Sequence, residues 1–226
     1  MPLLIKLYHF HKDKEEAIFE IAELIENILF KLIYTVAGYQ TNELPTTAKE
    51  YQDGLSELES ILRDYSEKGF RSWWNFSGDC KNYFTDYNWH YNGKIKYVLW
   101  KYENDLRSQK RSRLITPNEY INKYGKKQLE NTIDHITPQD PDFTEYTEDF
   151  KRDYLHNIGN LALMAWGDNS EKRNYNPVEK IKLFDKDYYS HEEIKEVLET
   201  KGIWGEDEIK TRRDNILKYI YRAWNL

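Results

Sequence analysis

Apolar residues recur every three or four positions through the first part of the chain, which is the spacing of one face of an α-helix. Residues 11–35 carry such a face, and acidic side chains in the first half of this segment suit the N-terminal end of a helix dipole. A second face runs from about Thr47 to Lys68, and Gly69 follows as a residue suited to ending a helix. We predict two amphipathic helices whose apolar faces lie in the core or, as the alternative, against a partner protein.

The same spacing predicts further helices later in the chain. Residues 93–108 and two segments within 191–226 place apolar residues at helical intervals. Between the early and later helices, residues 70–91 are dense in Trp, Tyr and Phe. These rings could stack on nucleic-acid bases or form a packed core between helices, and we predict the packed core.

Composition narrows the class of protein. The 226 residues suffice for one domain or two small ones, and the 15% aromatic share supplies large surfaces for burial although only 39% of residues are apolar. No segment has the run of uncharged apolar residues that a membrane span needs, and no secretory leader pattern opens the chain. The lone Cys80 excludes a disulfide framework and a thiolate zinc site, which agrees with a cytoplasmic location.

Charge is distributed unevenly along the chain. The formal net charge of −6 excludes a uniformly basic coat for nucleic acid, although it leaves room for a local basic groove. From Lys94 to Lys127, ten basic residues stand against three acidic ones. Such a segment is either a solvated helix face or a surface that follows a DNA backbone, and its place directly before the motifs described next supports the second interpretation as much as the first.

Residues 132–174 carry the most informative chemistry. Ile133 to Ile136 form a short strand-like run, and Leu161 to Met164 form a second one after a turn that Gly159 allows. Asn169, or the aspartate before it, can then cap a helix. We predict a strand, a loop, a strand and a helix that together can place an acid, an imidazole and an amide around one metal ion.

These residue types suit the hydrolysis of a phosphodiester bond. The reaction needs a base for water and a Lewis acid for the developing charge, and His135 is the natural base because its unperturbed pKa is near neutrality. Asp134 projects to the opposite face of the strand, so it reaches the same metal ion only if the strand bulges or curls. Asn169 offers a neutral amide oxygen. One carboxylate, one amide and several waters make a sparse oxygen site, which suits Mg²⁺ or Mn²⁺.

Three spaced motifs resemble those of the HNH (ββα-metal) endonucleases: Thr132-Ile-Asp-His-Ile-Thr-Pro-Gln139, His156-Asn-Ile-Gly-Asn-Leu-Ala-Leu163 and Asn169-Ser-Glu-Lys-Arg-Asn174. More narrowly, they are similar to the C-terminal nuclease domain of GmrSD-type modification-dependent restriction enzymes. The resemblance is tight over about residues 132–185, and it is specific because three separate elements agree.

The resemblance implies a role for each central motif residue. His135 would be the general base that activates water, and Asn160 would orient His135 through a hydrogen bond. Asp134 and Asn169 would be the metal ligands. The metal ion, Mg²⁺ or Mn²⁺, would stabilise the charge that develops on the phosphate and on the leaving oxygen.

Other residues near the motifs have supporting roles or ordinary structural ones. Lys172 or Arg173 would hold the scissile phosphate by the same resemblance. Lys180 could also contact a phosphate, or it could be a solvated lysine. His156 is either a structural donor or a catalytic group, and Asn174 could share or replace the ligand role of the preceding asparagine.

The resemblance also bears on partners. GmrSD-type enzymes commonly carry an N-terminal NTP-dependent sensing domain with an Asp-Gly-Gln-Gln-Arg-like motif, and this sequence contains no such motif. We therefore expect DNA as the substrate, a separate sensor or NTPase subunit as the protein partner, and no membrane partner, with an oligomer left open. The helices predicted within residues 11–68 are candidates for the docking surface.

Together these inferences predict a predominantly helical α+β protein with a ββα-metal finger embedded in a helical domain. Residues 1–125 would form a helical region for partner docking and a DNA groove, and residues 126–226 would form the nuclease region, with its ββα core at about 131–182. The expected function is a metal-dependent DNA endonuclease of a bacterial anti-phage or type IV-like restriction system. The alternatives are a non-catalytic subunit that binds DNA or a partner with the same scaffold, and an RNA-cleaving toxin.

Overall fold

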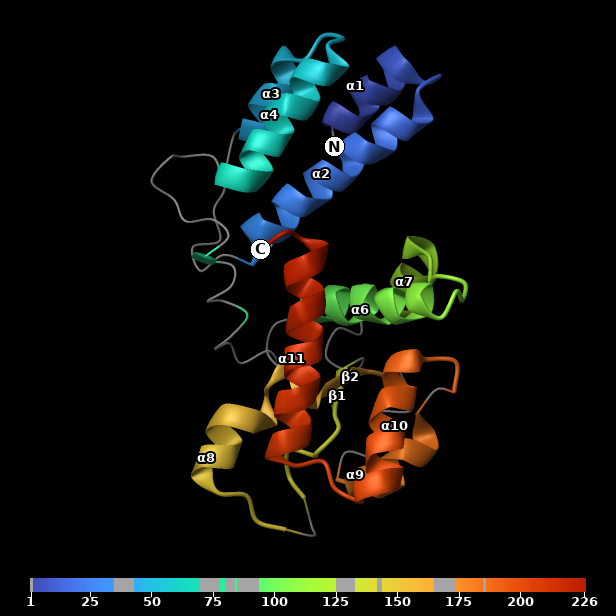
Figure 1. Ribbon diagram of the computed structural model, residues 1–226, viewed down its shortest axis with the longest axis vertical. Helices are drawn as coiled ribbons and strands as arrows, with labels where there is room; N and C mark the ends of the chain where they lie inside the picture. The colour runs from blue at the N-terminus through green and yellow to red at the C-terminus, as the bar shows by residue number, and fades with distance from the viewer. Residues whose placement is uncertain are drawn as a thin grey trace. The chain divides into compact units, whose positions relative to one another are not determined.

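The computed structural model describes residues 2–34, 43–69, 78–79, 84, 94–124, 133–141, 144–164, 174–184 and 186–226. Its contacts divide the chain into two compact units, Met1–Asp86 with Tyr221–Leu226, and Tyr87–Ile220. Figure 1 shows the helices and strands of both units. The division predicted at residue 125 falls within residues 125–132, which lie outside the described residues, and it stays a prediction.

Helices form the described part of the first unit: α1 (Pro2–His11), α2 (Glu15–Ile33), α3 (Glu43–Glu50) and α4 (Leu55–Lys68) (Figure 1). α2 packs against α4, and α1 packs against both α2 and α3. Apolar side chains from these helices and the turn after α3 share one core: Leu3, Leu7, Ile21, Ile25, Ile28, Leu32, Leu44, Ala48, Tyr51, Leu58 and Leu62. The apolar faces predicted from the sequence therefore lie in a common core.

The structure contains a helix before the first predicted segment, α1, and a break within the second predicted segment. The chain leaves the helical conformation at residues 12–14, between α1 and α2, and again at residues 51–54, between α3 and α4. The two breaks lie next to each other, because Nε2 of His11 is 2.7 Å from the hydroxyl oxygen of Tyr51. The ammonium of Lys6 also donates to the Tyr51 carbonyl at 3.1 Å. A tertiary contact thus stabilises the ends of two short helices.

The second helix also begins earlier than predicted. α3 starts at Glu43, so the predicted start near Thr47 was wrong. Pro45 lies in the first turn of α3, where the N–H groups have no carbonyl partner within the helix. A proline there costs the helix no hydrogen bond, so Pro45 is compatible with a helix that begins before it.

Among the aromatic residues of the predicted core at 70–91, the structure describes Phe84. Phe84 is buried and packs on Phe30 and Tyr34, with ring centroids 5.6 and 5.0 Å away. Trp224 also stacks on Phe30, with the two ring centroids 3.6 Å apart. The remaining aromatic residues of the predicted cluster lie outside the described residues, so stacking on bases stays untested.

The described part of the second unit joins helices to one small sheet. Its elements are α6 (Ile95–Gln109), α7 (Pro117–Tyr124), β1 (Ile133–His135), α8 (Glu148–Phe150), the π-helical turn η2 (Lys151–Leu155), the 3₁₀ turn η3 (Ile158–Asn160), β2 (Leu161–Leu163), α9 (Pro177–Lys180), the 3₁₀ turn η4 (Ile181–Leu183), α10 (Tyr189–Lys201) and α11 (Glu206–Ala223). The predicted fold class, predominantly helical α+β, is confirmed. Within the described ranges, no helix is long and apolar enough to cross a membrane.

β1 and β2 pair in antiparallel register, as the predicted strand–loop–strand order requires. Apolar side chains from this sheet and from the surrounding helices form a second core: Ile136, Phe150, Leu155, Ala162, Met164, Phe184, Ile194, Leu198, Trp204 and Ile209. The helix predicted directly after Asn169 falls in residues 165–173, outside the described part of the chain. The helix that follows in the structure is α9, which Asn176 caps by accepting the Glu179 N–H at 3.0 Å.

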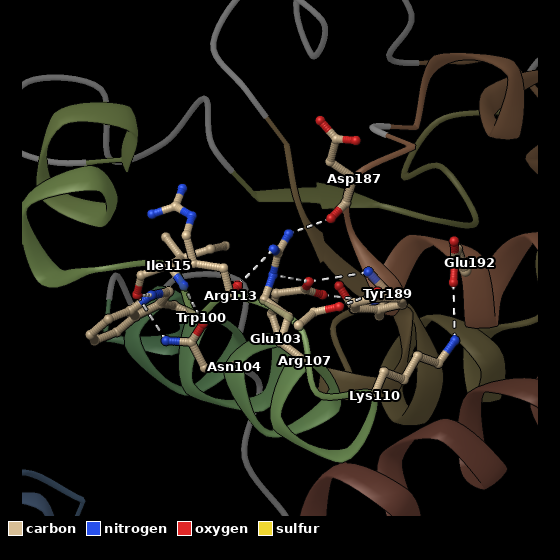
Figure 2. A network of polar contacts seen from close by, with 12 residues as sticks. Trp100, Glu103, Asn104, Arg107, Lys110, Arg113, Ile115, Asp187, Tyr189 and Glu192 are labelled. Atoms are coloured by element: carbon tan, nitrogen blue, oxygen red, sulfur yellow. Dashed lines mark hydrogen bonds and ion pairs between the residues drawn. The ribbon is translucent and has the colours of Figure 1, made fainter.

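α6 holds the first turn of α10 through one buried carboxylate. Glu103 accepts the N–H groups of Tyr189 and Ser190 at 3.1 and 2.8 Å, so it caps α10 from a different helix (Figure 2). Arg107, one turn further along α6, donates to Glu103 at 2.8 Å and to the Asp187 carbonyl (Figure 2). This network holds the first turn of α10 against α6.

Several cations of the predicted basic segment are engaged within the second unit. Lys110 lies 3.1 Å from the Glu192 carboxylate, and Arg113 lies 2.7 Å from Glu119. Lys96 is buried, and this burial lowers its pKa to about 8. Part of the local positive charge is therefore balanced by carboxylates of the same unit, and contact between this segment and a DNA backbone stays a prediction.

Candidate active site

Two of the predicted site residues are neighbours on β1. Asp134 stands opposite Ala162 in a register that contains no bulge, and the pairing extends past the strand because the Ile136 N–H donates to the Asn160 carbonyl at 2.8 Å. Consecutive residues of a strand point to opposite faces, so Asp134 and His135 leave β1 on different sides. The bulge that would turn both side chains toward one ion is therefore absent from this strand pair.

His135 is paired with a second imidazole. Its Nε2 lies 3.0 Å from Nδ1 of His156, and the ring planes meet at 72°. One of the two nitrogens must donate and the other accept, so this contact couples the tautomers of the two rings. His135 is only 4% exposed, whereas His156 is partly buried, so His156 is the more accessible ring. The structure thus places the predicted supporting histidine directly against the predicted base.

Asn160 acts on the backbone around the histidine pair. Its Oδ1 accepts the Thr137 N–H at 2.9 Å, and its Nδ2 donates to the carbonyl groups of Thr137 and Leu155 at 3.1 and 2.8 Å. The resemblance implies that Asn160 orients His135 through a hydrogen bond, and the bonds that the structure shows for this side chain go to these three backbone groups. Asn160 is fully buried and joins the segment after His135 to the turn before His156.

Lys180 lies in the interior beside β1. Its Nζ is 2.9 Å from Oδ2 of Asp134 and 2.6 Å from the carbonyl oxygen of His135, and the residue is 1% exposed. Burial lowers the pKa of the Lys180 ammonium, and the Asp134 charge opposes this effect. The structure places Lys180 at neither predicted position, a phosphate contact or a solvated surface, because α9 carries its side chain inward to an ion pair.

α11 lies against the turn that carries Asn160. Nη1 of Arg212 donates to the carbonyl groups of Gly159 and Leu161 at 3.1 and 2.8 Å. Its guanidinium therefore binds the backbone on both sides of Asn160. A Cβ atom on Gly159 would lie 2.0 Å from the carbonyl oxygen of Ile209. The sequence assigned this glycine to a turn, and the structure shows that the close approach of α11 also requires it.

The Arg212 side chain is buried. Burial lowers its pKa, while the neighbouring Tyr102 and Glu193 favour its charged form. Tyr102 donates its hydroxyl to both carboxylate oxygens of Glu193 at 3.1 Å. Burial raises the pKa of Glu193, an effect that the charge of Arg212 opposes. Tyr102 of α6, Glu193 of α10 and Arg212 of α11 thus interact with one another next to the turn that carries Asn160.

Three of the predicted site residues have no described position. Asn169, Lys172 and Arg173 fall within residues 165–173, and their roles stay predictions. Asn174 is exposed at the point where the described chain resumes. Its role as an alternative ligand is equally untested.

The donor atoms on β1 are compatible with a sparsely liganded cation. Over the described ranges, no three His, Cys, Asp or Glu side chains converge in a way that could hold a metal ion. This donor set does not fit a zinc site closed by four protein ligands. Lys180 occupies one oxygen of Asp134, and a carboxylate has further lone pairs for a cation. Asn169 lies outside the described residues, so a Mg²⁺ or Mn²⁺ site made of Asp134, the amide of Asn169 and waters stays a prediction.

The sequence reasoning missed Arg212, although its position contains a signal. Arg212 lies three residues after Ile209 and four before Ile216, so it occupies the apolar face of α11. A cation at such a position suggests a buried acceptor, which here is the backbone of η3 and β2. Glu103 lies on α6 between apolar positions in the same way.

Comparison with known proteins identifies one family. The family model for the C-terminal domain of GmrSD restriction endonucleases matches residues 71–219. This range covers more than half of the chain, and it includes both strands and every motif residue discussed above. Neither the curated proteins nor the solved structures contain a match to the chain.

Proposed function

The chain belongs to the family of GmrSD restriction endonuclease C-terminal domains, and we propose on this premise that it is a metal-dependent HNH endonuclease that hydrolyses DNA phosphodiester bonds. Family membership supports a nuclease domain related to restriction endonucleases. One observation carries the finer proposal: Asp134 and His135 are adjacent on a paired strand, and His156 contacts His135 at 3.0 Å. We further propose that the chain serves a bacterial anti-phage or type IV-like restriction system together with a separate sensor or NTPase subunit.

His135 is the base of the proposed reaction. The proposal assigns the pair one tautomer, in which Nε2–H of His135 donates to Nδ1 of His156 and the His135 ring takes the proton of a water molecule. The contact to His156 survives this step, because the imidazolium keeps its Nε2–H. His156 therefore fixes the tautomer, and Asn160 holds the backbone that follows the base.

The remaining residues bind the phosphate and the cation. Asp134 and Asn169 would hold Mg²⁺ or Mn²⁺, which supplies a Lewis acid for the charge on the phosphate and the leaving oxygen. Lys172 or Arg173 would bind the scissile phosphate through charge-assisted hydrogen bonds. Asp134 leaves the sheet on the side opposite His135, so both side chains would reach one phosphate only at the end of β1, where the chain bends at residues 136–137.

A non-catalytic subunit that binds DNA or a partner is the second candidate. Two observations favour it: His135 is 4% exposed, and Asp134 is already paired with the buried Lys180. Such a subunit would bind DNA with an affinity that falls steeply with salt, and it would not cut in the presence of a divalent cation.

A cleavage assay separates these candidates. Purified protein is incubated with modified plasmid, unmodified plasmid and RNA, each with Mg²⁺, Mn²⁺ or EDTA. We expect cation-dependent cutting of DNA, a loss of at least about 100-fold in His135→Ala because the base is removed, and a loss of about tenfold or more in His156→Ala. His9→Ala is the matched control, because His9 is exposed on α1 of the other unit.

The outcome assigns the function. Cutting that survives in His135→Ala would refute the catalytic role of this histidine. Salt-sensitive DNA binding without cutting would establish the binding subunit, and cleavage of RNA alone would establish an RNase.

A further inference from the structure

One buried cation near the proposed active site has no part in the reaction described above. Lys180 places its ammonium 2.9 Å from the Asp134 carboxylate and 2.6 Å from the His135 carbonyl oxygen. These two acceptors belong to consecutive residues of β1, and they are the proposed metal ligand and the proposed base. A single side chain from α9 therefore touches both central residues of the site.

We propose that Lys180 is a positioning residue that fixes the Asp134 side chain relative to the backbone of His135. This inference rests on the proposed function, because it assigns Lys180 to the same site. An ammonium has three donors in fixed tetrahedral directions, so two bonds from it hold a carboxylate in one orientation relative to a carbonyl group. β1 has only three residues, so its own ladder constrains the end of the strand weakly.

Lys180 is itself held in place. It ends α9, a short helix that begins with Pro177 after the cap residue Asn176. Its side chain is 1% exposed, which removes it from any contact with DNA. The backbone of Lys180 is thus held by α9, and its ammonium is held by two acceptor oxygens.

Packing alone does not account for a charge at this position. Burying an ammonium carries a large desolvation cost, and an apolar side chain of similar length would fill the same space without it. The favourable interactions of the charge are with Asp134 and with the His135 carbonyl. The function that we assign to this charge is therefore to orient the two groups of β1 that it contacts.

The proposal predicts opposite effects on turnover and cation affinity. Without Lys180, the Asp134 carboxylate turns more freely, so the kcat of cleavage falls. The same change removes a positive charge that repels a divalent cation, so that cation binds more tightly. Loss of a merely structural residue would lower both quantities, and loss of a phosphate contact would raise KM for DNA.

The experiment compares the full-length variants Lys180→Met and Lys180→Gln with wild type. Lys182→Met is the matched control, because Lys182 is exposed two residues further along. We measure kcat and KM on a DNA duplex, and the affinity for Mn²⁺ from the electron paramagnetic resonance signal of free Mn²⁺. We expect Lys180→Met to lose at least tenfold in kcat, to stay within threefold in KM, and to bind Mn²⁺ at least threefold more tightly. Lys180→Gln should be intermediate, because its amide still donates to an acceptor but carries no charge.

A metal-free measurement separates this inference from the proposed function. The ring resonances of His135 in ¹³C-labelled protein should shift in Lys180→Met and Lys180→Gln and stay unchanged in Lys182→Met. Unchanged resonances would overturn the positioning role even if wild type cuts no DNA. Equal losses of kcat and Mn²⁺ affinity, or a rise in KM alone, would also overturn it. If Lys180→Met fails to fold, Lys180→Gln decides the question: a lower kcat with tighter Mn²⁺ binding supports the proposal, and any other combination overturns it.

Discussion

Replacing Gly159 with alanine tests how tightly α11 packs on the site turn. The new Cβ would lie 2.0 Å from the carbonyl oxygen of Ile209 and 2.9 Å from the backbone nitrogen of Arg213. Both atoms belong to the backbone of α11, so neither can move aside as a flexible side chain would. The helix and the turn must separate by about 1 Å or more to restore ordinary contact distances.

This separation has a calculable cost. Overpacking of a rigid contact costs about 1–3 kcal/mol, and the displaced turn also weakens the bonds from Arg212 to the carbonyl groups of Gly159 and Leu161. Each bond to a charged donor contributes about 1.5–3 kcal/mol. We therefore expect Gly159→Ala to lower the free energy of unfolding of the second unit by about 3 kcal/mol or more.

Urea unfolding measures this change. With a slope of about 2 kcal/mol per molar urea, the midpoint should fall by about 1.5 M. Gly205→Ala is the matched control: its Cβ would meet only side-chain atoms, at 3.6 Å or more, so its cost should stay below about 1 kcal/mol even though it precedes α11. Equal midpoints for the two variants would refute the argument, because they would show that the turn and α11 separate freely.

The first of two further predictions concerns the α6 network of Figure 2, and the second concerns Glu119 of α7. Glu103→Gln removes the charge that faces Arg107 and one acceptor for the start of α10, so the free energy of unfolding should fall by about 2–4 kcal/mol in thermal melts. Glu192→Gln is its control and should cost less than about 1 kcal/mol, because the ion pair with Lys110 is exposed; equal melting temperatures would contradict the prediction. The hydrogen bond from Arg113, followed by those from Thr116, lowers the pKa of Glu119 to about 2. A lowered carboxyl pKa adds stability above the unfolded value near 4.5, and this contribution is lost as pH falls toward 2. A carboxyl NMR titration should therefore show a midpoint near 2 that rises toward 4.5 in Arg113→Gln, and a midpoint near 4.5 in the wild type would exclude the pairing.

Local patterns predicted the long helices and the strand order. α6, α10 and α11 lie where apolar spacing placed helices, and both strands lie at the two predicted apolar runs. Helical and strand periodicities arise from neighbouring residues, so they are visible without knowledge of the rest of the chain. The same is true of the motif residues, whose spacing led to the family that the comparison identifies.

Helix boundaries depended on distant contacts. The apolar spacing continues across the break at residues 51–54, and the His11–Tyr51 contact beside this break joins residues forty positions apart. α3 begins at Glu43 and contains Pro45 in its first turn, although a proline in a sequence often marks the boundary of a helix. Local sequence is a poor guide to an end that is stabilised from elsewhere.

The candidate site divides in the same way. Sequence alone named His135, Asp134 and Asn160, because their types and order carry the motif. Their partners were not predictable: Lys180 lies 46 residues from Asp134, and Arg212 lies 51 residues from Leu161. The sequence treated Lys180 as a surface cation, since nothing in its neighbours indicates that α9 turns it inward.

Sequence by itself determined the class of protein, the identity of the family and the residues that define its motif, because composition, periodicity and spacing are properties of the linear chain. Only the tertiary structure decided how those residues are held: a histidine against a histidine, an asparagine on backbone groups, and a lysine between an aspartate and a carbonyl group. The physical reason is that hydrogen bonds and burial depend on distances in space, and folding brings together residues that no local pattern connects.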